Sequence, residues 1–425
     1  MNTKATTENY YGTSDKISDN GRPSFLDKWS RSLVLKMVDK IKYGRLVLRD
    51  GENQWTLGQE QGITAHLTVR HPKFYRKLLF GGSIGAGEAY VDHLWDSEDL
   101  TLLIRLMALN MDRLDKMDHG FAWLLRLIQL LAHAANRNSK QGAKRNIISH
   151  YDLGNDMYQS FLDSTMMYSS AIYPDTESSL ETASLNKLEI ICRKLDLNPD
   201  DNVIEIGSGW GGFAIYAAKN YGCHVTSTTI SDAQYEEAKK RVAAAGLEDK
   251  ITLLKNDYRD LTGKYDKLVS IEMIEAVGHK YLPEFFEKCG QLLKEDGAML
   301  LQAITVIDQR YDYYVRSVDF LQRHIFPGGS VVSNHRMIDL LTTKTDMVVR
   351  HLEDFGFHYA RTLKDWRLRF NNAFTGLKSK GYDEAFRRLW EYYLTYCEGG
   401  FWERAISVVH IVATRPSNRG IVGIT

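Results

Sequence analysis

The feature that most constrains this 425-residue chain is a short apolar run, 203–206, that ends in a glycine-rich turn, 207–212. Glycine permits a tight turn there, and it lets backbone N–H groups approach a ligand at the start of the next helix. From about residue 200 onward, segments with the pattern of strands alternate with segments with the pattern of helices. This alternation predicts an α/β fold with a parallel, doubly wound sheet.

The elements of this sheet follow from the same pattern. Strands are expected over 202–207, 223–230, 250–257, 264–273 and 297–307, and helices over 211–222, 232–246 and 281–294. The segment 403–416 alternates and is rich in β-branched residues. We therefore expect it to add a last strand beside 297–307.

The end of the strand expected over 223–230 indicates which class of cofactor the glycine turn binds. A strand that binds a dinucleotide usually ends in Asp or Glu, which bonds the ribose. Here the strand ends in Thr228 and Thr229, and Gln234 follows. This disfavours hydride transfer and favours a mononucleotide-type thioether or sulfonium cofactor. A tight turn with a purely structural role is the competing interpretation of the glycines.

The segment 24–135 predicts a separate domain, mixed but mostly helical, after a flexible tail over 1–23. Ser24 and Asp27 have the spacing of a capping box, so a first helix is expected to start there. Its apolar positions are Leu26, Trp29, Leu33, Met37 and Ile41, and its basic positions are Lys28, Arg31, Lys36, Lys40 and Lys42. Such a helix can lie on an anionic membrane surface, or it can pack on the core as an ordinary surface helix.

Shorter patterns predict the rest of this domain. Alternating runs within 44–70 predict strands of a small sheet, the glycine-rich segment 81–95 predicts a turn leading into a helix, and 98–133 is helical. The longest apolar run, 121–133, is interrupted by Arg126 and Gln129 and is shorter than the roughly 20 residues that span a bilayer. The polar, basic segment 136–147 is expected to link the two domains.

Composition excludes several classes of function. The 54 basic and 54 acidic residues give a formal net charge of zero, so no global field favours nucleic acid. Cys192, Cys223, Cys289 and Cys397 show no zinc-binding spacing, so we expect no metal and a reducing compartment. The N-terminus lacks the apolar core of a secretory signal. These features predict a cytoplasmic protein that associates peripherally with a membrane.

Ordered motifs run along most of the chain. They are GEAYVDHLW, DSEDL, ISHYDLGNDMYQSFLDSTMMYSSAIY, EIGSGWGGFAIYAA, TTISDAQ, NDYRD, SIEMIEAVG, HIFPGG, DFGFHYARTLKDW and YYLTYCEGGF. With these motifs the chain resembles the cyclopropane fatty acid synthases and the related mycolic acid and fatty acid methyltransferases. The resemblance implies a class I S-adenosylmethionine-dependent methyltransferase domain over 148–416, with a seven-stranded sheet that has an antiparallel edge. It also implies a cap over an acyl pocket, about 308–402, and suggests a homodimer.

The resemblance also implies which residues of this sequence bind the cofactor and which are catalytic. The implied contacts to S-adenosylmethionine are Tyr151, Tyr168, Ser169, Gly207, Gly209, Gly212, Thr228, Thr229, Gln234, Asp257 and Tyr258. The implied catalytic positions are Glu275, Tyr359, Ser170 and Cys397. His150 is expected to support the segment that covers the cofactor, and Arg259 and Asp260 to form a surface pair.

The implied chemistry is electrophilic, because the π electrons of a cis double bond attack the methyl group of the cofactor. A carboxylate such as Glu275 stabilises the resulting cation, and the family uses a bound bicarbonate to accept a proton. Ser170 stands where the family has a cysteine, and Ile304 where it has a histidine. An isoleucine side chain donates no hydrogen bond, so these departures count against bicarbonate in this chain. The alternative is that a water or Gln302 replaces the lost ligands and ring closure persists.

We expect the chain to form cyclopropane rings on unsaturated acyl chains of membrane phospholipids. The paired departures suggest one alternative, a related methyltransferase whose products are methylene- or methyl-branched chains. A second alternative is a methyltransferase of a small soluble metabolite. A third is a non-catalytic accessory protein that only binds lipid or cofactor.

Overall fold

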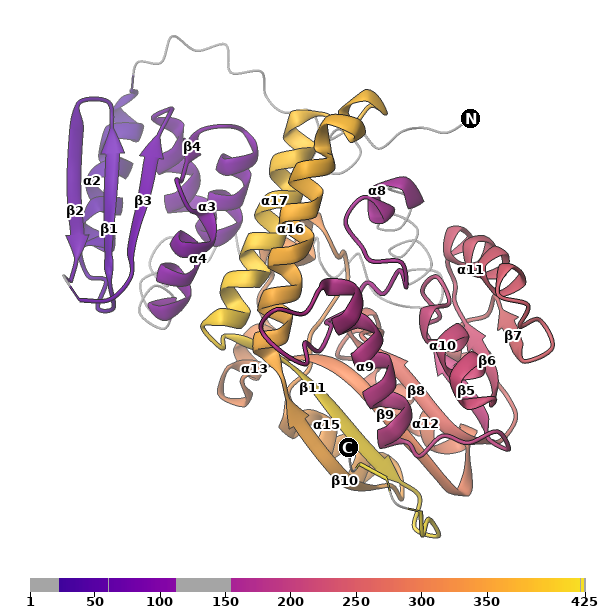
Figure 1. Ribbon diagram of the computed structural model, residues 1–425. Helices are drawn as coiled ribbons and strands as arrows, with labels where there is room; N and C mark the ends of the chain where they lie inside the picture. The colour runs from indigo at the N-terminus through magenta and orange to yellow at the C-terminus, as the bar shows by residue number, and fades with distance from the viewer. Residues whose placement is uncertain (1–22, 60, 112–153, 421, 424–425) are drawn as a thin grey trace. The chain divides into compact units, whose positions relative to one another are not determined.

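The computed structural model describes residues 23–59, 61–111, 154–420 and 422–423, which fall into two units (Figure 1). The first unit comprises the described residues of Met1–Ala135 with Arg316–Pro327 and Trp366–Ala405. The second comprises those of Asn136–Val315 with Gly328–Asp365 and Ile406–Thr425. The expected linker 136–147, the apolar run 121–133, His150 and Tyr151 lie outside the described residues.

A seven-stranded sheet forms the centre of the second unit, in the order β10-β11-β9-β8-β5-β6-β7. Its strands are β5 (Asn202–Ile206), β6 (His224–Thr228), β7 (Ile251–Leu254), β8 (Tyr265–Ile271), β9 (Leu293–Val306), β10 (Val348–Asp354) and β11 (Ile406–Thr414). Strands β5 to β9 run parallel, and β11 is antiparallel to both β9 and β10. The predicted α/β sheet is confirmed, including the last strand beside 297–307.

The antiparallel strand lies one position inside the sheet rather than at its edge. The edge strand is β10, which falls within the segment 308–402 that the resemblance assigns to the cap. None of the residues of β10 is fully buried. A strand with so little buried surface lacks the apolar alternation by which strands are recognised in a sequence.

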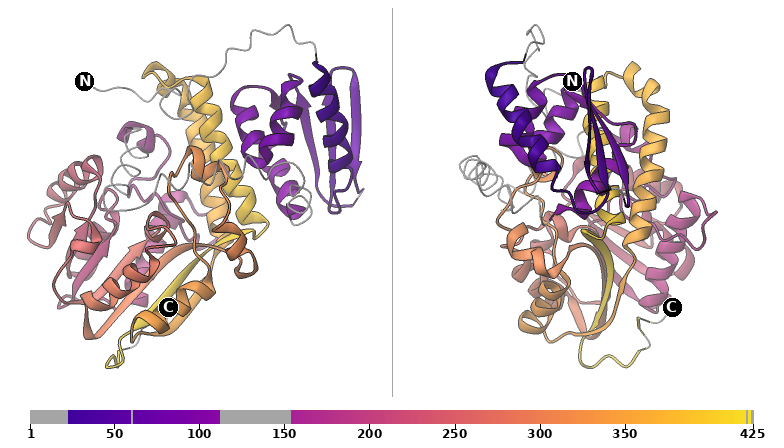
Figure 2. Two further views of the ribbon diagram at one scale, coloured as in Figure 1. Left: turned by 180° about the vertical axis from the view of Figure 1, so that it is seen from behind. Right: turned by 90° about the vertical axis from the view of Figure 1, so that its left-hand side faces the viewer.

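Helices cover both faces of this sheet (Figure 1; Figure 2). One face packs against α12 (Leu282–Leu292) and α15 (Asn334–Lys344), and the other against α9 (Leu180–Lys194), α10 (Gly212–Tyr221) and α11 (Asp232–Ala244). Phe285 and Phe286 of α12 and Phe213 of α10 are fully buried in these layers. Each such side chain stabilises the fold by about 1.5–3 kcal/mol, so the two layers hold the carboxyl ends of the strands in place.

The first unit contains a four-stranded sheet in the order β2-β1-β3-β4. Its elements are α2 (Phe25–Val38), β1 (Arg45–Asp50), β2 (Asn53–Gly58), β3 (Thr64–Val69), α3 (Lys73–Val91), β4 (Trp95–Asp96), α4 (Leu100–Leu109), α14 (Phe320–His324) and α17 (Glu384–Trp402). Helix α17 packs in this unit through Arg388, which lies 3.7 Å from the ring centroid of Tyr90 and bonds the Trp95 carbonyl at 2.9 Å. The segment expected as the cap is therefore divided between the units.

Two local predictions in the first unit need correction. A glycine break does lead into a helix within 81–95, but it is a kink at Gly82, where φ is 54°, inside α3, which already starts at Lys73. The capping box of Ser24 and Asp27 is confirmed, but the buried face of α2 is shifted by one residue from the predicted stripe. It consists of Asp27, Ser30, Val34 and Val38, because Asp27 caps the helix and pairs with Arg76 at 3.9 Å.

Helix α2 therefore leaves apolar side chains at the surface. Phe25 is 86% exposed, Leu26 39% and Trp29 36%. Among the described residues, no helix has the length and apolar character that a bilayer crossing requires.

Candidate active site

The glycine turn lies at the carboxyl end of β5 and leads into α10. Gly207, Gly209 and Gly211 have φ values of 102°, 49° and 85°, a region that favours glycine over residues with a side chain. At Gly212 the constraint is space, because an added β-carbon would lie 2.6 Å from the Thr165 carbonyl oxygen. Met273 packs against the turn at Gly207 and Met167 at Gly212, whereas an added β-carbon at Gly209 would meet nothing within 4 Å. We call this glycine turn the cradle; it lies at the end of a parallel strand, where α/β proteins bind ligands.

The residues predicted after β6 lie beside this cradle. The N–H groups of Gly207 and Ser208 donate to the Thr228 carbonyl at 3.0 and 2.8 Å. The Thr229 hydroxyl donates to Gln234 Oε1 at 2.9 Å, so these two buried side chains hold each other. The hydroxyl and the amide keep further hydrogen-bonding capacity, which suits contacts to ribose hydroxyls.

Asp257 and Tyr258 follow β7, where η1 (Tyr258–Asp260) begins. The sequence predicts a surface pair of Arg259 and Asp260, and this prediction is wrong. The Arg259 guanidinium instead donates two hydrogen bonds to the Asp257 carboxylate, at 2.7 and 2.8 Å. The side chains of this pair are only 8% and 12% exposed. The Tyr258 ring packs edge-on against Phe285 at 5.5 Å, so this corner of the site is fixed to α12.

The segment from α8 (Asn155–Gln159) to Tyr173 packs onto the glycine turn. The indole of Trp210 donates to Asn155 at 3.0 Å, and its ring lies 5.0 Å from that of Tyr158. Tyr168 packs edge-on against Tyr158 at 5.2 Å. These contacts place the segment of Tyr168, Ser169 and Ser170 beside the cradle. The roles of these residues in cofactor binding and catalysis stay predictions.

A buried lysine that the sequence analysis missed lies under this segment. Lys187 of α9 donates to the Ser169 hydroxyl at 2.7 Å, and its side chain is fully buried. Burial lowers the pKa of Lys187 to about 8, although the carboxylates of Glu272, Asp163 and Glu205 oppose the shift. Burial in turn raises the pKa of Glu205 to about 7. Lys187 is a buried cation within a group of acids.

Two glutamates lie at the carboxyl end of β8, the strand next to β5. Glu272 directly follows β8, and Glu275 lies in η2 (Ile274–Ala276). Met273, between them, contacts the glycine turn, because a β-carbon on Gly207 would lie 3.0 Å from the side chain of Met273. The acid pair is thus adjacent to the cradle.

Three donors from three separate segments of the chain converge on the Glu272 carboxylate. Its Oε1 accepts from the Ser170 N–H at 2.8 Å and from Gln302 Nε2 at 2.7 Å, and its Oε2 accepts from the Tyr359 hydroxyl at 2.6 Å. Glu272 has a φ of 49°, a left-handed conformation that costs a non-glycine residue about 1–2 kcal/mol. Burial raises the pKa of Glu272, and the three donors oppose that shift.

Glu275 is bound on one side only. Its Oε1 accepts from the Ile304 N–H at 2.6 Å, and the described residues offer its buried Oε2 no hydrogen-bond partner. Burial, with the neighbouring charge of Glu272, raises the pKa of Glu275 to about 8. At neutral pH Glu275 is therefore mainly protonated.

A chain of hydrogen bonds through His410 and Lys194 orients the Gln302 side chain. Its Oε1 lies 3.0 Å from His410 Nε2, and His410 Nδ1 lies 3.1 Å from Lys194 Nζ, which pairs with Glu353. Burial and the nearby Lys194 charge lower the pKa of His410 well below its usual value. A neutral ring that accepts from Lys194 must donate from Nε2, so Gln302 turns its NH₂ toward Glu272.

The structure thus brings together three of the four predicted catalytic positions, Ser170, Glu275 and Tyr359. Cys397 lies buried on α17 in the other unit, so its role stays a prediction. Ile304 contributes its backbone N–H, whereas Gln302 brings a side-chain donor into the cluster. Glu272 was missed as a site residue, because the strand predicted over 264–273 includes it, whereas Gln302 is the residue named from the sequence as a substitute for the lost ligands.

Comparisons with known proteins agree with this geometry. The family described as mycolic acid cyclopropane synthetase matches residues 138–411. The tuberculostearic acid methyltransferase UfaA1 of Mycobacterium tuberculosis is 36% identical over 365 residues, which cover 84% of each chain. The cyclopropane-fatty-acyl-phospholipid synthase of Escherichia coli is 35% identical over 358 residues, which cover 84% of this chain and 90% of that one.

Solved structures show the same fold. The mycolic acid cyclopropane synthase CmaA1, complexed with SAH and CTAB, superposes with a TM-score of 0.60 at 26% identity and covers 64% of this chain and 98% of that chain. The cyclopropane synthase MmaA2 from Mycobacterium tuberculosis gives the same values. With its catalytic unit built around the glycine cradle and the acid pair, this chain belongs to the mycolic acid cyclopropane synthetase family of S-adenosylmethionine-dependent methyltransferases.

Proposed function

We propose that the enzyme adds a methyl-derived carbon to a cis double bond in the acyl chain of a membrane phospholipid and closes a cyclopropane ring. The observation that carries the proposal is the acid pair, Glu272 and Glu275, which Met273 joins to the glycine turn. A carboxylate at this place stabilises a cation that develops on a bound alkene. The names of the relatives, a fatty-acyl-phospholipid synthase and a fatty acid methyltransferase, support the lipid substrate.

The residues at the glycine turn fit S-adenosylmethionine. At Gly209 the cradle leaves room for a ligand against the backbone, because nothing lies within 4 Å of an added β-carbon, and the N-terminus of α10 supplies N–H donors. When bound, the cofactor would supply an electrophilic methyl group on a sulfonium sulfur. The residues that would hold it are Tyr168, Ser169, Gly207, Gly209, Gly212, Thr228, Thr229, Gln234, Asp257 and Tyr258.

The chain's own residues then have three tasks. The cradle and the packed segment around Tyr168 orient the reacting groups and exclude water, which favours carbon–carbon bond formation without a protein nucleophile. The charge of the acid pair stabilises the cation on the acyl chain. Loss of a proton from the added carbon, with closure onto the cationic carbon, completes the ring.

An open-chain product is the second candidate. The cation can instead rearrange by a hydride shift and lose a proton to give a methylene branch, which requires no ring closure. Two observations favour this candidate, namely the changed donors at Ser170 and Gln302 and the similarity to a tuberculostearic acid methyltransferase.

A direct test uses vesicles of dioleoyl phosphatidylglycerol and S-adenosylmethionine carrying a labelled methyl group. Label is expected in the dioleoyl lipid and absent from matched distearoyl vesicles, which have no double bond. Equal labelling of both lipids would contradict alkene methylation. Cofactor turnover without lipid, on a water-soluble acceptor, would favour the small-metabolite alternative, and binding without turnover would favour an accessory protein.

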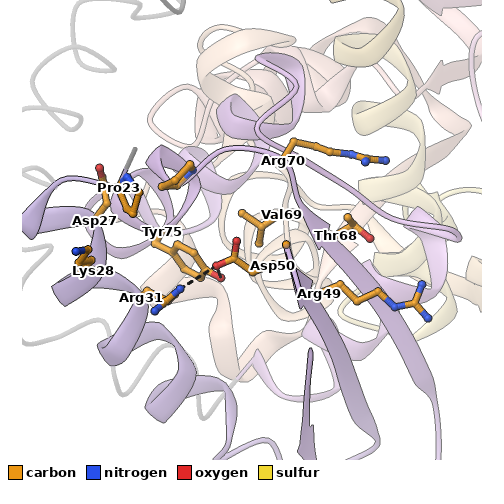
Figure 3. A pocket seen from close by; sticks show the side chains of 12 residues that line it. Pro23, Asp27, Lys28, Arg31, Arg49, Asp50, Thr68, Val69, Arg70 and Tyr75 are labelled. Atoms are coloured by element: carbon orange, nitrogen blue, oxygen red, sulfur yellow. Dashed lines mark hydrogen bonds and ion pairs between the residues drawn. The ribbon is translucent and has the colours of Figure 1, made fainter. Parts of the chain in front are cut away.

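We also propose that the first unit docks on an anionic phospholipid surface through α2. Phe25, Lys28, Trp29 and Lys36 share the outer face of this helix and are exposed. Aromatic rings beside lysines are typical of helices that lie in a membrane interface. A cavity of about 530 Å³ lies beside α2, and in it Arg31 and Tyr75 both donate hydrogen bonds to Asp50 (Figure 3). Its cationic lining residues, Lys28, Arg31, Arg49 and Arg70, complement phosphate.

A further inference from the structure

The three donors around Glu272 have the arrangement of an anion site. A backbone N–H, a side-chain amide and a tyrosine hydroxyl point at one carboxylate within 2.6–2.8 Å. Bicarbonate is itself a small planar oxyanion and needs such donors. In this chain the Glu272 carboxylate already takes all three of them, so bicarbonate does not fit beside it.

The backbone at Glu272 supports a functional reason for this arrangement. Its φ of 49° favours glycine, yet the chain places a glutamate there and so directs the carboxylate into the donor cluster. Strained residues of this kind persist where the surroundings hold them, and they concentrate at functional sites.

The bonding of Glu272 also leaves it able to accept a proton. Its Oε2 accepts a hydrogen bond from Tyr359, and a carboxylate oxygen has two lone pairs. The residue is partly exposed rather than fully buried, as access by a bound chain requires. Glu275, its neighbour, already uses Oε1 for the Ile304 N–H.

We infer that Glu272 is a built-in catalytic base that replaces bicarbonate in this enzyme. The inference rests on the proposed function. After the alkene π pair has formed the new carbon–carbon bond and the carbon–sulfur bond has broken, one carbon of the acyl chain is cationic. A C–H bond of the product-forming carbon then breaks, its electron pair closes the ring or forms a double bond, and the proton moves to Glu272. Glu272 later releases this proton to water, so the base is regenerated.

Three proteins test this inference in buffer stripped of carbon dioxide. The wild type should label dioleoyl vesicles at the same rate with and without added bicarbonate. E272Q keeps the shape but not the basicity, so its rate should fall about 100-fold or more, and bicarbonate should not restore it. E272G opens the anion site, so it should be equally slow alone and recover at least about tenfold when bicarbonate is added.

A control variant and a binding measurement separate chemistry from folding. Asp196 has a φ of 50° and is exposed, so D196G makes the same backbone change away from the acid pair and should keep wild-type activity. Saturation-transfer NMR with ¹³C-bicarbonate should detect binding to E272G but not to the wild type, a readout that needs no turnover.

The outcomes distinguish this inference from the proposed function. No label from the wild type in lipid would overturn both. An active wild type that requires bicarbonate, or an E272Q variant that keeps more than about a tenth of the wild-type rate, would overturn the role of Glu272 alone. An E272G variant that binds no bicarbonate and is not rescued would do the same.

Discussion

The hydroxyl of Tyr359 donates a 2.6 Å hydrogen bond to Glu272 Oε2 and so ties α16 (Gly356–Ser379) to the end of β8. This bond stabilises the charged form of Glu272. A hydrogen bond to a charged group contributes about 1.5–3 kcal/mol, so Y359F should lower kcat by roughly 10- to 100-fold. Steady-state kinetics on dioleoyl vesicles would measure this, and an unchanged kcat would contradict the role of Tyr359.

The raised pKa of Glu275, about 8, predicts a pH dependence of stability. The folded protein keeps this proton at pH values where the unfolded chain has lost it, so the free energy of unfolding falls as pH rises from about 4.5 to about 8. The groups that face Glu275 are the Glu272 carboxylate and the Ile304 N–H, and Lys187 opposes the charge of Glu272. E275Q removes this titration.

Thermal denaturation of E275Q and the wild type at pH 5.5, 7 and 8.5 would check this sign. The Tm of E275Q minus that of the wild type should grow as the pH rises. A difference that shrinks over this range would show that the Glu275 pKa is not raised.

The orientation of Gln302 predicts an effect on both activity and stability. Q302L removes a donor to Glu272 and leaves the buried Nε2–H of His410 without its acceptor. An unsatisfied buried donor costs about 1–3 kcal/mol, so chemical denaturation should show a loss of that size, with a lower kcat. Wild-type stability in Q302L would contradict the assigned hydrogen-bond chain from Lys194 to Glu272.

The glycine cradle predicts a steric effect on cofactor binding. In G212A the new β-carbon would meet the Thr165 carbonyl at 2.6 Å, so the turn must shift. We expect calorimetry to show an affinity for S-adenosylmethionine lowered at least about tenfold, which is about 1.4 kcal/mol. G376A, on α16 where the structure places nothing within 4 Å of an added β-carbon, is the matched control and should bind normally. Equal affinities would argue against cofactor binding at this turn.

The exposed face of α2 predicts membrane binding that depends on two aromatic residues. F25S with W29S should weaken sedimentation with phosphatidylglycerol vesicles, because both rings are exposed and adjacent to lysines. Ile338, 39% exposed on α15, provides the control I338S, which should sediment like the wild type. If the double variant still binds fully, α2 is not the docking surface.

The sequence predicts the elements of the large sheet well, because their apolar alternation and glycine turn are local signals. It does not predict β10, whose residues lie at an exposed edge and carry little apolar pattern. It also misplaces the buried face of α2, because Asp27 is drawn inward by capping and by Arg76 rather than by apolar packing.

The site shows the same division between local and non-local signals. Local sequence motifs predict the cradle and Glu275. The role of Glu272, in contrast, depends on a left-handed backbone angle and on hydrogen-bond donors from residues 170, 302 and 359. The roles of Gln302 and Ile304 depend on which side chain of β9 reaches the acids. These relationships appear only when distant segments of the chain are brought together.

The most direct test of ring formation on acyl chains is the mass of the acyl product formed from dioleoyl phospholipid and trideuteromethyl S-adenosylmethionine. We expect one added carbon that keeps two deuterium atoms, with chromatography against standards separating a ring from a methylene branch. Three retained deuterium atoms would contradict ring closure and show an intact methyl group. No label in the lipid, with an enzyme that still binds its cofactor, would contradict the claim that it methylates acyl chains.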